Sequence, residues 1–184
     1  MKTCEGVNFW LKFKHSMDEL KSVKNLSLVG TFMAIWLVLN LFVVEVSSFL
    51  CISFEFIAVF FVSAMFGPIV GAIFGFFGDL VCYFVHPVGA FFIWYAVSVM
   101  IDGLIYGLIL YKNNYNIKNV VLAQIARDVI TNVILNSIFI WMQFGGNFFH
   151  MFLFVRIPKN IIKIPVNCIL MIFLTKIFKN LVKK

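Results

Sequence analysis

Charged residues are scarce in this 184-residue chain, where they make up 12% of the sequence and only eight are acidic. Soluble domains carry about 25% charged residues, so this shortage excludes a water-soluble fold. Hydrophobic residues instead reach 62%, and the mean hydropathy is +1.01. Since a membrane span needs roughly 20 mostly apolar residues, the length predicts about six spans and leaves no room for a soluble domain. We therefore predict a single membrane domain, 1–184.

Catalytic and metal-binding patterns are also missing. The four cysteines are scattered without a CxxC pair, and the three histidines are isolated. No HExxH, GxSxG, Walker or paired-carboxylate pattern occurs. These absences predict no enzyme activity, no metal site and no ATP hydrolysis by this chain alone. A short secretion signal with a small-residue cleavage site is absent as well, which predicts that the first span is retained.

The positive charges are unevenly placed. The formal net charge of +7 invites a nucleic-acid interpretation, but the lysines gather before the first span, in one middle loop and at the end of the chain. This is the pattern of cytoplasmic segments in membrane proteins. It predicts cytoplasmic termini and a cytoplasmic middle loop around Lys112 and Lys118.

Apolar runs separated by turn signals give the predicted helices. The fold class is an all-α integral membrane protein, a compact bundle of six transmembrane helices with both termini cytoplasmic. Gly67-Pro68 marks an inner turn, while 45–53, 86–89 and 145–147 are expected as outer loops. Glycines in the third helix indicate close helix–helix approach. The predicted spans are 26–44, 54–66, 69–85, 91–111, 120–144 and 152–178.

The first 24 residues predict a cytoplasmic amphipathic segment. Trp10, Phe13, Met17 and Leu20 recur at helical spacing, with lysines on the other face. A helix of this kind lies in the membrane interface and is attracted by anionic lipid. Docking of a partner protein is the alternative.

The last predicted span contains an unusual group of cations and amides. At helical spacing, one broad face carries Arg156, Lys159 or Asn160, Lys163 and Asn167. A charged side chain at bilayer depth costs roughly 2.5–3.5 kcal/mol on insertion scales, so such residues usually face a cavity or a partner. We assign Arg156 to a solute carboxylate, because a guanidinium matches a carboxylate bidentately. The alternative is that Arg156 reaches the lipid headgroups as an interfacial anchor.

Other polar residues of the predicted spans lie at a similar depth. Asn132 and Asn136 are four residues apart on the fifth helix, and Gln124 and Asp128 extend this stripe inward. Hydrogen bonding between helices would explain one such residue, whereas the whole group favours a ligand cavity. With Arg156, Lys159 and Asn160, the predicted substrate-binding residues are Asn132, Asn136, Asp79, Trp94, Tyr95 and Ser98.

Three further charged groups have a different interpretation. Arg127 is expected to reach the interface or to pair with Asp128 or Asp102, and an ion pair that supports the bundle is favoured over a proton pathway. Lys163 is ambiguous, because it could neutralise Asp79 instead of contacting a solute.

Several blocks resemble a known family. They are His15 to Leu26, Gly30 to Ala34, Phe66 to Ala72 with Gly78 to Leu80, Gly103 to Leu108, Leu135 to Ser137, and Arg156 with Lys159-Asn160 and Ile164-Pro165. Together they resemble the S components of energy-coupling factor (ECF) vitamin transporters, and most closely the folate-specific type. The resemblance covers nearly the whole chain from about residue 15.

This resemblance implies a subunit that captures folate at the outer face of the bacterial plasma membrane. It also implies a transmembrane coupling subunit and two ATPase subunits as partners, with ATP used by those partners and no cofactor in this chain. The family's small-xxx-small motif, which docks the coupling subunit, corresponds to Gly30 and Ala34; ordinary packing inside the bundle is the alternative. Capture of another vitamin, or a membrane enzyme or channel, are the competing functions.

Overall fold

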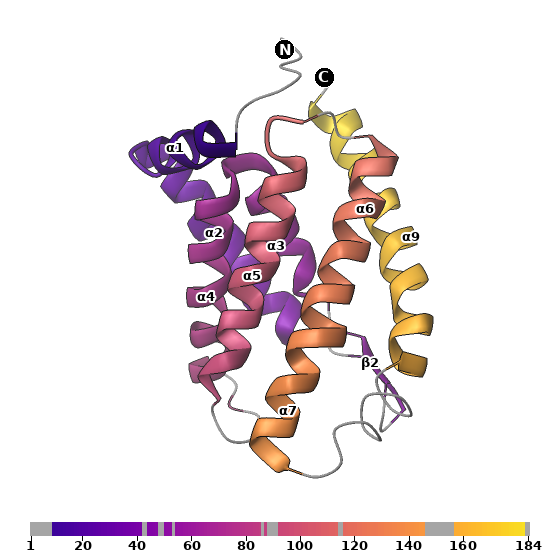
Figure 1. The fold of residues 1–184 in the computed structure, drawn as a ribbon. Helices are drawn as coiled ribbons and strands as arrows, with labels where there is room; N and C mark the ends of the chain where they lie inside the picture. Colours follow the sequence, from indigo (N-terminus) through magenta and orange to yellow (C-terminus); the bar gives the residue numbers. More distant parts are fainter. Residues whose placement is uncertain are drawn as a thin grey trace. The chain divides into compact units, whose positions relative to one another are not determined.

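The computed structural model describes residues 9–41, 44–47, 50–52, 54–85, 87, 92–113, 116–145 and 157–182. Within these ranges the regular structure is helical apart from one short hairpin (Figure 1). The chain divides into two compact units, 1–113 and 114–184, and each is described by itself. The single domain expected from the sequence stays a prediction.

The described helices confirm a helical membrane protein. Four of them are long and apolar enough to cross a membrane, namely Val23–Leu41, Pro68–Val85, Ile93–Leu110 and Ile117–Phe139, and the apolar helix Phe56–Phe66 is shorter. Each of the six predicted spans contains a described helix. The number of membrane crossings and the side on which the termini lie stay predictions.

The first unit contains, in chain order, α1 (Phe9–Glu19), α2 (Val23–Leu41), β1 (Val44–Ser47), β2 (Leu50–Ile52), α3 (Phe56–Phe66), α4 (Pro68–Val85) and α5 (Ile93–Leu110). The strands correct one expectation, because 45–53 was predicted as a loop. β1 and β2 instead pair antiparallel, with Val44 opposite Ile52 and Glu45 opposite Cys51. Branched residues in short runs favour paired strands, which satisfy their backbone groups between themselves.

Helix α3 forms the centre of the first unit. Ala58, Val59, Phe60 and Val62 are almost fully buried, as expected for a helix that is apolar on all sides. The ring of Phe60 packs edge-on against Tyr106 of α5 at 5.3 Å. Because α3 is covered by its neighbours, eight of its 11 residues are buried.

The predicted turn at Gly67-Pro68 is confirmed. Gly67 has a φ of 94°, a conformation that L side chains rarely adopt, and it joins α3 to α4. Pro68 then begins α4, where its missing N–H costs nothing. The chain thus reverses without an intervening loop.

Glycines bring α4 and α5 into backbone contact, as the sequence predicted. The two helices run side by side (Figure 1), and Gly71 and Gly103 face each other with no space for a Cβ on either. A Cβ on Gly75 would lie 2.5 Å from the backbone oxygen of Val99. On another side of α4, the indole ring of Trp36 from α2 fills the space above Gly78.

Helix α1 contacts the bundle through polar residues, which the sequence did not predict. The Ser16 hydroxyl donates to the Phe66 carbonyl oxygen at 2.8 Å. The Lys12 ammonium donates to the Leu108 carbonyl oxygen at 2.9 Å, and burial lowers the pKa of Lys12. Trp10 remains 81% exposed. Lys12, expected on the face opposite the apolar residues, therefore contacts the bundle, while anchoring of the apolar face in the membrane interface stays a prediction.

The second unit contains α6 (Ile117–Arg127), the π-helical segment η1 (Asp128–Leu135), α7 (Asn136–Phe144) and α9 (Ile157–Val182). α6, η1 and α7 follow one another as one long helix, with α9 packed beside α6 (Figure 1). Pro165 lies within α9. Asn132 and Asn136 lie in η1 and at the start of α7, respectively.

Candidate functional site

A ladder of polar side chains runs along α6, η1 and the start of α7. The carboxylate of Asp128 is 1% exposed and accepts hydrogen bonds of 2.8 Å from the side-chain amides of Gln124 and Asn132. The Asn136 amide then donates to the Asn132 side-chain oxygen at 3.4 Å. We call Gln124, Asp128, Asn132 and Asn136 the amide–carboxylate ladder. The stripe predicted from the four-residue spacing is therefore present and connected.

The sequence predicted an ordinary helix over 120–144. The helix that carries the ladder departs from regular α-helical winding. Residues Asp128–Leu135 are wound as a π-helix, and the Asn136 backbone N–H bonds to the Thr131 carbonyl oxygen five residues earlier. A run of branched residues, Val129 to Thr131, weakens the preference for α-helical winding at this point. π-helical segments are rare and occur frequently at functional sites.

The predicted ion pair of Arg127 is confirmed with Asp128. The guanidinium nitrogen lies 2.8 Å from the carboxylate oxygen, and both side chains are largely buried. The charge of Asp128 is thus matched by a cation and by two amide donors, as a buried carboxylate requires. Pairing with Asp102, the other possibility, joins residues of different units and stays a prediction.

Two buried polar side-chain atoms of the second unit have no hydrogen-bond partner among the described residues. The Asn167 amide nitrogen on α9 and the Thr131 hydroxyl oxygen on η1 are both enclosed without a hydrogen bond. Asn167 is 1% exposed and belongs to the face of cations and amides predicted for the last span. A buried polar atom without a partner is costly, so it marks a place where a solute or water can bind. Thr131 carried no signal in the sequence, because a threonine in an apolar helix is ordinary.

The cations proposed for the solute lie at or before the beginning of α9. Arg156 lies outside the described residues. Lys159 and Asn160 belong to the first turns of α9, but their side chains are outside the described part of the chain. Lys163 is half-buried. The assignment of these residues to a solute stays a prediction.

The predicted site residues of the first unit are on α4 and α5. Ser98 is buried, Asp79 and Tyr95 are half-buried, and Trp94 is 43% exposed. The Tyr95 ring contacts Phe92 at 5.6 Å. These four residues lie in the first unit and the ladder lies in the second, so a cavity that they share stays a prediction.

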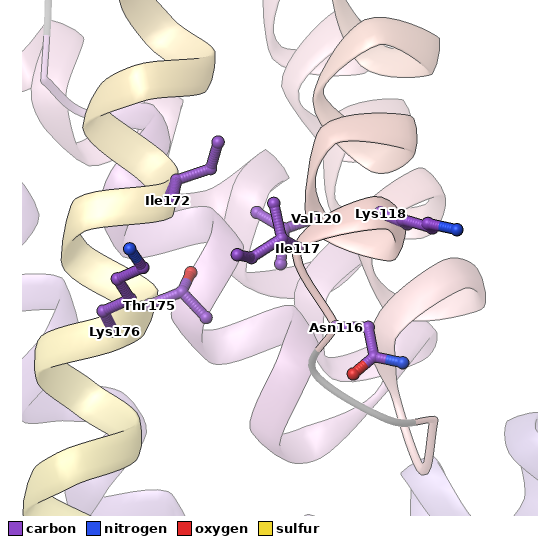
Figure 2. Close-up of a pocket in the computed structure, with 7 residues that line it drawn as sticks. All are labelled: Asn116, Ile117, Lys118, Val120, Ile172, Thr175 and Lys176. Atoms are coloured by element: carbon purple, nitrogen blue, oxygen red, sulfur yellow. The ribbon is translucent and has the colours of Figure 1, made fainter.

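The second unit also contains a cavity of about 480 Å³ between the start of α6 and the later part of α9. Figure 2 shows Ile117 and Val120 directed toward α9 and Lys118 directed away from it. The lining residues are Asn116, Ile117, Lys118, Val120, Ile172, Thr175 and Lys176. None of these is a predicted solute residue, and the wall lacks the carboxylate–amide pairs of the ladder.

The proposed docking pair lies on an open face of α2. Gly30 and Ala34 are exposed, and a Cβ built on Gly30 would meet no atom within 4 Å. Among the residues of α2, only Trp36 is buried. Within the described first unit Gly30 therefore has no close packing neighbour, and both the docking role and packing in the bundle stay predictions.

No group of three or more histidine, cysteine, aspartate or glutamate side chains that could hold a metal ion occurs in the part of the chain that the structure describes. The predicted site residues and the ladder instead provide amides, hydroxyls, aromatic rings, carboxylates and cations. This set suits hydrogen bonding and charge pairing rather than metal coordination.

Apolar helices that enclose a hydrogen-bonded polar ladder define a membrane protein suited to hold a polar solute. Residues 20–180 match the family model described as ECF-type riboflavin transporter, S component. The chain therefore belongs to the ECF transporter S components, as its sequence motifs predicted. This family is a transporter component and not an enzyme, so the membrane-enzyme alternative is wrong.

Two relatives are similar over much of the chain. It is 31% identical over 119 residues to the folate transporter FolT of Clostridium novyi (strain NT), covering 64% of this chain and 68% of that protein. It also resembles a solved structure described as the crystal structure of FolT bound with folic acid. That match has a TM-score of 0.76 and 27% sequence identity, and it covers 84% of this chain and 94% of the other.

Proposed function

We propose that this protein captures folate for uptake. The observation that carries the proposal is the likeness in fold to FolT bound with folic acid over 84% of this chain. The similarity to a curated folate transporter supports it independently. Folate offers a flat pterin with N–H donors and two carboxylates, which amide oxygens and cations can bind.

The proposal gives each predicted site residue a role in folate binding. Arg156 binds a carboxylate of folate with Lys159 as a second cation, while Asn160, Asn136 and Asn132 orient polar groups. Trp94 and Tyr95 supply aromatic surface for the pterin, and Ser98 and Asp79 supply further hydrogen-bonding groups. Asn167, whose buried amide nitrogen has no partner among the described residues, adds a donor on α9.

The proposed setting is the plasma membrane of a bacterium. Six helices cross it with both termini on the cytoplasmic side, in agreement with the placement of the lysines. A transmembrane coupling subunit docks on the face of α2 that includes Gly30 and Ala34, and two ATPase subunits supply the energy. This chain uses no cofactor of its own.

Riboflavin is the second candidate, because the matching family model is described as a riboflavin transporter component. Its isoalloxazine ring also stacks on aromatic residues and offers an N–H donor between two carbonyl groups. It carries no carboxylate, however, and so would leave the cationic start of α9 without a partner. Folate is therefore favoured by the charge of the proposed site.

Binding by the purified chain tests this proposal. The protein is extracted in detergent, and any small molecule that co-purifies is identified by mass spectrometry. Folate and riboflavin are then titrated separately while tryptophan fluorescence is followed. We expect saturable folate binding and at most weak riboflavin binding. Lys118→Ala, on an exposed residue outside the proposed site, is the matched control and should bind like the wild type. Tight riboflavin binding without folate binding would overturn the proposal.

A further inference from the structure

We infer that Asp128 is a positioning residue that makes Asn136 present its side-chain oxygen, a hydrogen-bond acceptor, to the amino-bearing edge of the ligand. The inference rests on the proposed function and names the group by which this site selects its solute. It assigns to Asp128 a role beyond that of an ion-pair partner.

The carboxylate of Asp128 sets the donor-to-acceptor direction of the hydrogen bonds in the ladder. Three N–H donors converge on its carboxylate at 2.8 Å, from Gln124, Arg127 and Asn132. A carboxylate in such a position accepts hydrogen bonds and offers none. The side chain of Asn132 must therefore turn its nitrogen toward Asp128, whichever way an amide could otherwise be rotated.

The orientation of Asn132 in turn fixes the orientation of the Asn136 side-chain amide. With its nitrogen bound to Asp128, Asn132 turns its oxygen toward the next rung, where it accepts from the Asn136 nitrogen at 3.4 Å. The amide oxygen of Asn136 is consequently on the side turned away from Asn132. A carbonyl oxygen has two lone pairs, so it can accept from a solute in addition to a neighbouring group.

Asp128 is the one acidic side chain of its unit that can orient these amides. It is the sole acidic residue between positions 114 and 184, where nine lysines and arginines occur. Its burial also keeps water from competing for the carboxylate. No other carboxylate of the second unit can therefore fix the orientation of the two asparagines.

An acceptor at the end of the ladder selects a ligand with N–H donors. The 2-amino-4-oxo edge of folate presents an amino group beside a ring N–H. An analogue that carries a methyl group in place of the 2-amino group keeps the shape but loses this donor. The Asn136 oxygen would then lose the hydrogen bond from the ligand, which costs about tenfold in affinity.

The experiment measures the ratio of the dissociation constants of 2-desamino-2-methylfolate and folate. In the wild type we expect a ratio of about tenfold or more. Asp128→Asn keeps the size of the side chain but permits the amides of Asn132 and Asn136 to rotate, so that nitrogen and oxygen exchange places. The ratio should then fall below about threefold. A merely structural role would weaken both ligands equally and leave the ratio unchanged, which would overturn the inference.

A second variant provides rescue. Asp128→Asn combined with Asn132→Asp moves the carboxylate one rung along the ladder, where it can still accept from Asn136 and restore the ratio. Asp102→Asn, at a buried carboxylate of the other unit, is the matched control and should leave the ratio as in the wild type.

The remaining outcomes are also decisive. If Asp128→Asn does not fold, Asn132→Leu cuts the ladder while keeping the ion pair, and the ratio should again fall; an unchanged ratio would overturn the inference. Failure of the wild type to bind folate would instead contradict the proposed function. Binding of folate with equal ratios in all variants would contradict only the role of Asp128.

Discussion

Ser16 performs a role normally taken by a residue of the capped helix itself. Its hydroxyl oxygen accepts from the backbone N–H groups of Ile69 and Val70 at 3.1 and 3.2 Å. These are N–H groups of the first turn of α4, which have no partner within the helix. Ser16 thus caps α4 from α1, across more than 50 positions of sequence.

Removing this cap should lower the stability of the protein. We expect Ser16→Ala to reduce the free energy of unfolding by about 1–2 kcal/mol, because three hydrogen bonds, two of them buried, are lost. Thermal unfolding in detergent measures the change. Ser27→Ala, at an exposed serine of α2, is the control and should unfold like the wild type. Equal unfolding temperatures for all three proteins would contradict the capping role.

Arg156 should dominate the affinity for folate. Loss of one partner of a buried, hydrogen-bonded charge pair costs roughly 2–5 kcal/mol, so Arg156→Ala should weaken binding by tens-fold to thousands-fold. Arg156→Lys should recover only part of it, since an ammonium does not match a carboxylate bidentately. Titration of both purified variants with folate checks this. Near wild-type affinity in Arg156→Ala would mean that the arginine serves the membrane interface.

Residue-level prediction from the sequence succeeded where partners are close along the chain. The spacing of four between Asp128, Asn132 and Asn136 placed them on one stripe, and adjacency suggested the pair with Arg127. Ser16 could not be found in this way, because its partners are distant in sequence and a serine in an amphipathic helix is ordinary. The π-helical winding was equally hidden, since local spacing does not distinguish it from an α-helix.

At the scale of helices, glycine spacing was the most informative signal. It predicted the close approach of α4 to its neighbours, and Gly71, Gly75 and Gly78 all lack room for a side chain. The hairpin of β1 and β2 was missed because its seven residues fall between two long apolar runs. The amphipathic pattern of α1 was recognised, but its polar contacts with the bundle were not.

The exposed face of α2 should matter for transport and not for binding. Replacing Gly30 and Ala34 with leucine adds bulk where the first unit leaves open space, so folding and folate affinity should be retained. Uptake by the complete transporter should fall to background, because a small-residue face permits close approach of a second helix. Folate titration of the purified variant and uptake by cells carrying all subunits measure the two effects.

Variants on a different exposed face of α2 supply the control. Leu28 is exposed on a side of the helix turned away from Gly30 and Ala34, so Leu28→Met, which changes the volume little, should leave uptake unchanged. A loss of folate affinity in the Gly30 and Ala34 variant that equals its loss of uptake would assign the pair to the ligand site or to the bundle.

At the scale of the whole molecule, binding and transport should be separable. The sequence contains no nucleotide-binding pattern, so we expect the chain alone to lack an energy source for uphill transport. Liposomes that contain only this protein should bind folate and accumulate none of it in their lumen, with or without ATP. Addition of the coupling and ATPase subunits with ATP should permit accumulation. Robust uptake by this chain alone would contradict the proposed division of labour.

Substitutions at Gly30 and at Gly78 should have different effects. The space above Gly78 is occupied by the Trp36 ring, whereas the space above Gly30 is open. In a library of variants scored for protein amount and for vitamin-dependent growth, substitutions at Gly78 would lower both scores together. On the proposed docking face, substitutions at Gly30 would lower growth alone. A genetic screen could thus distinguish variants that impair assembly of the transporter from variants that impair folding of this subunit.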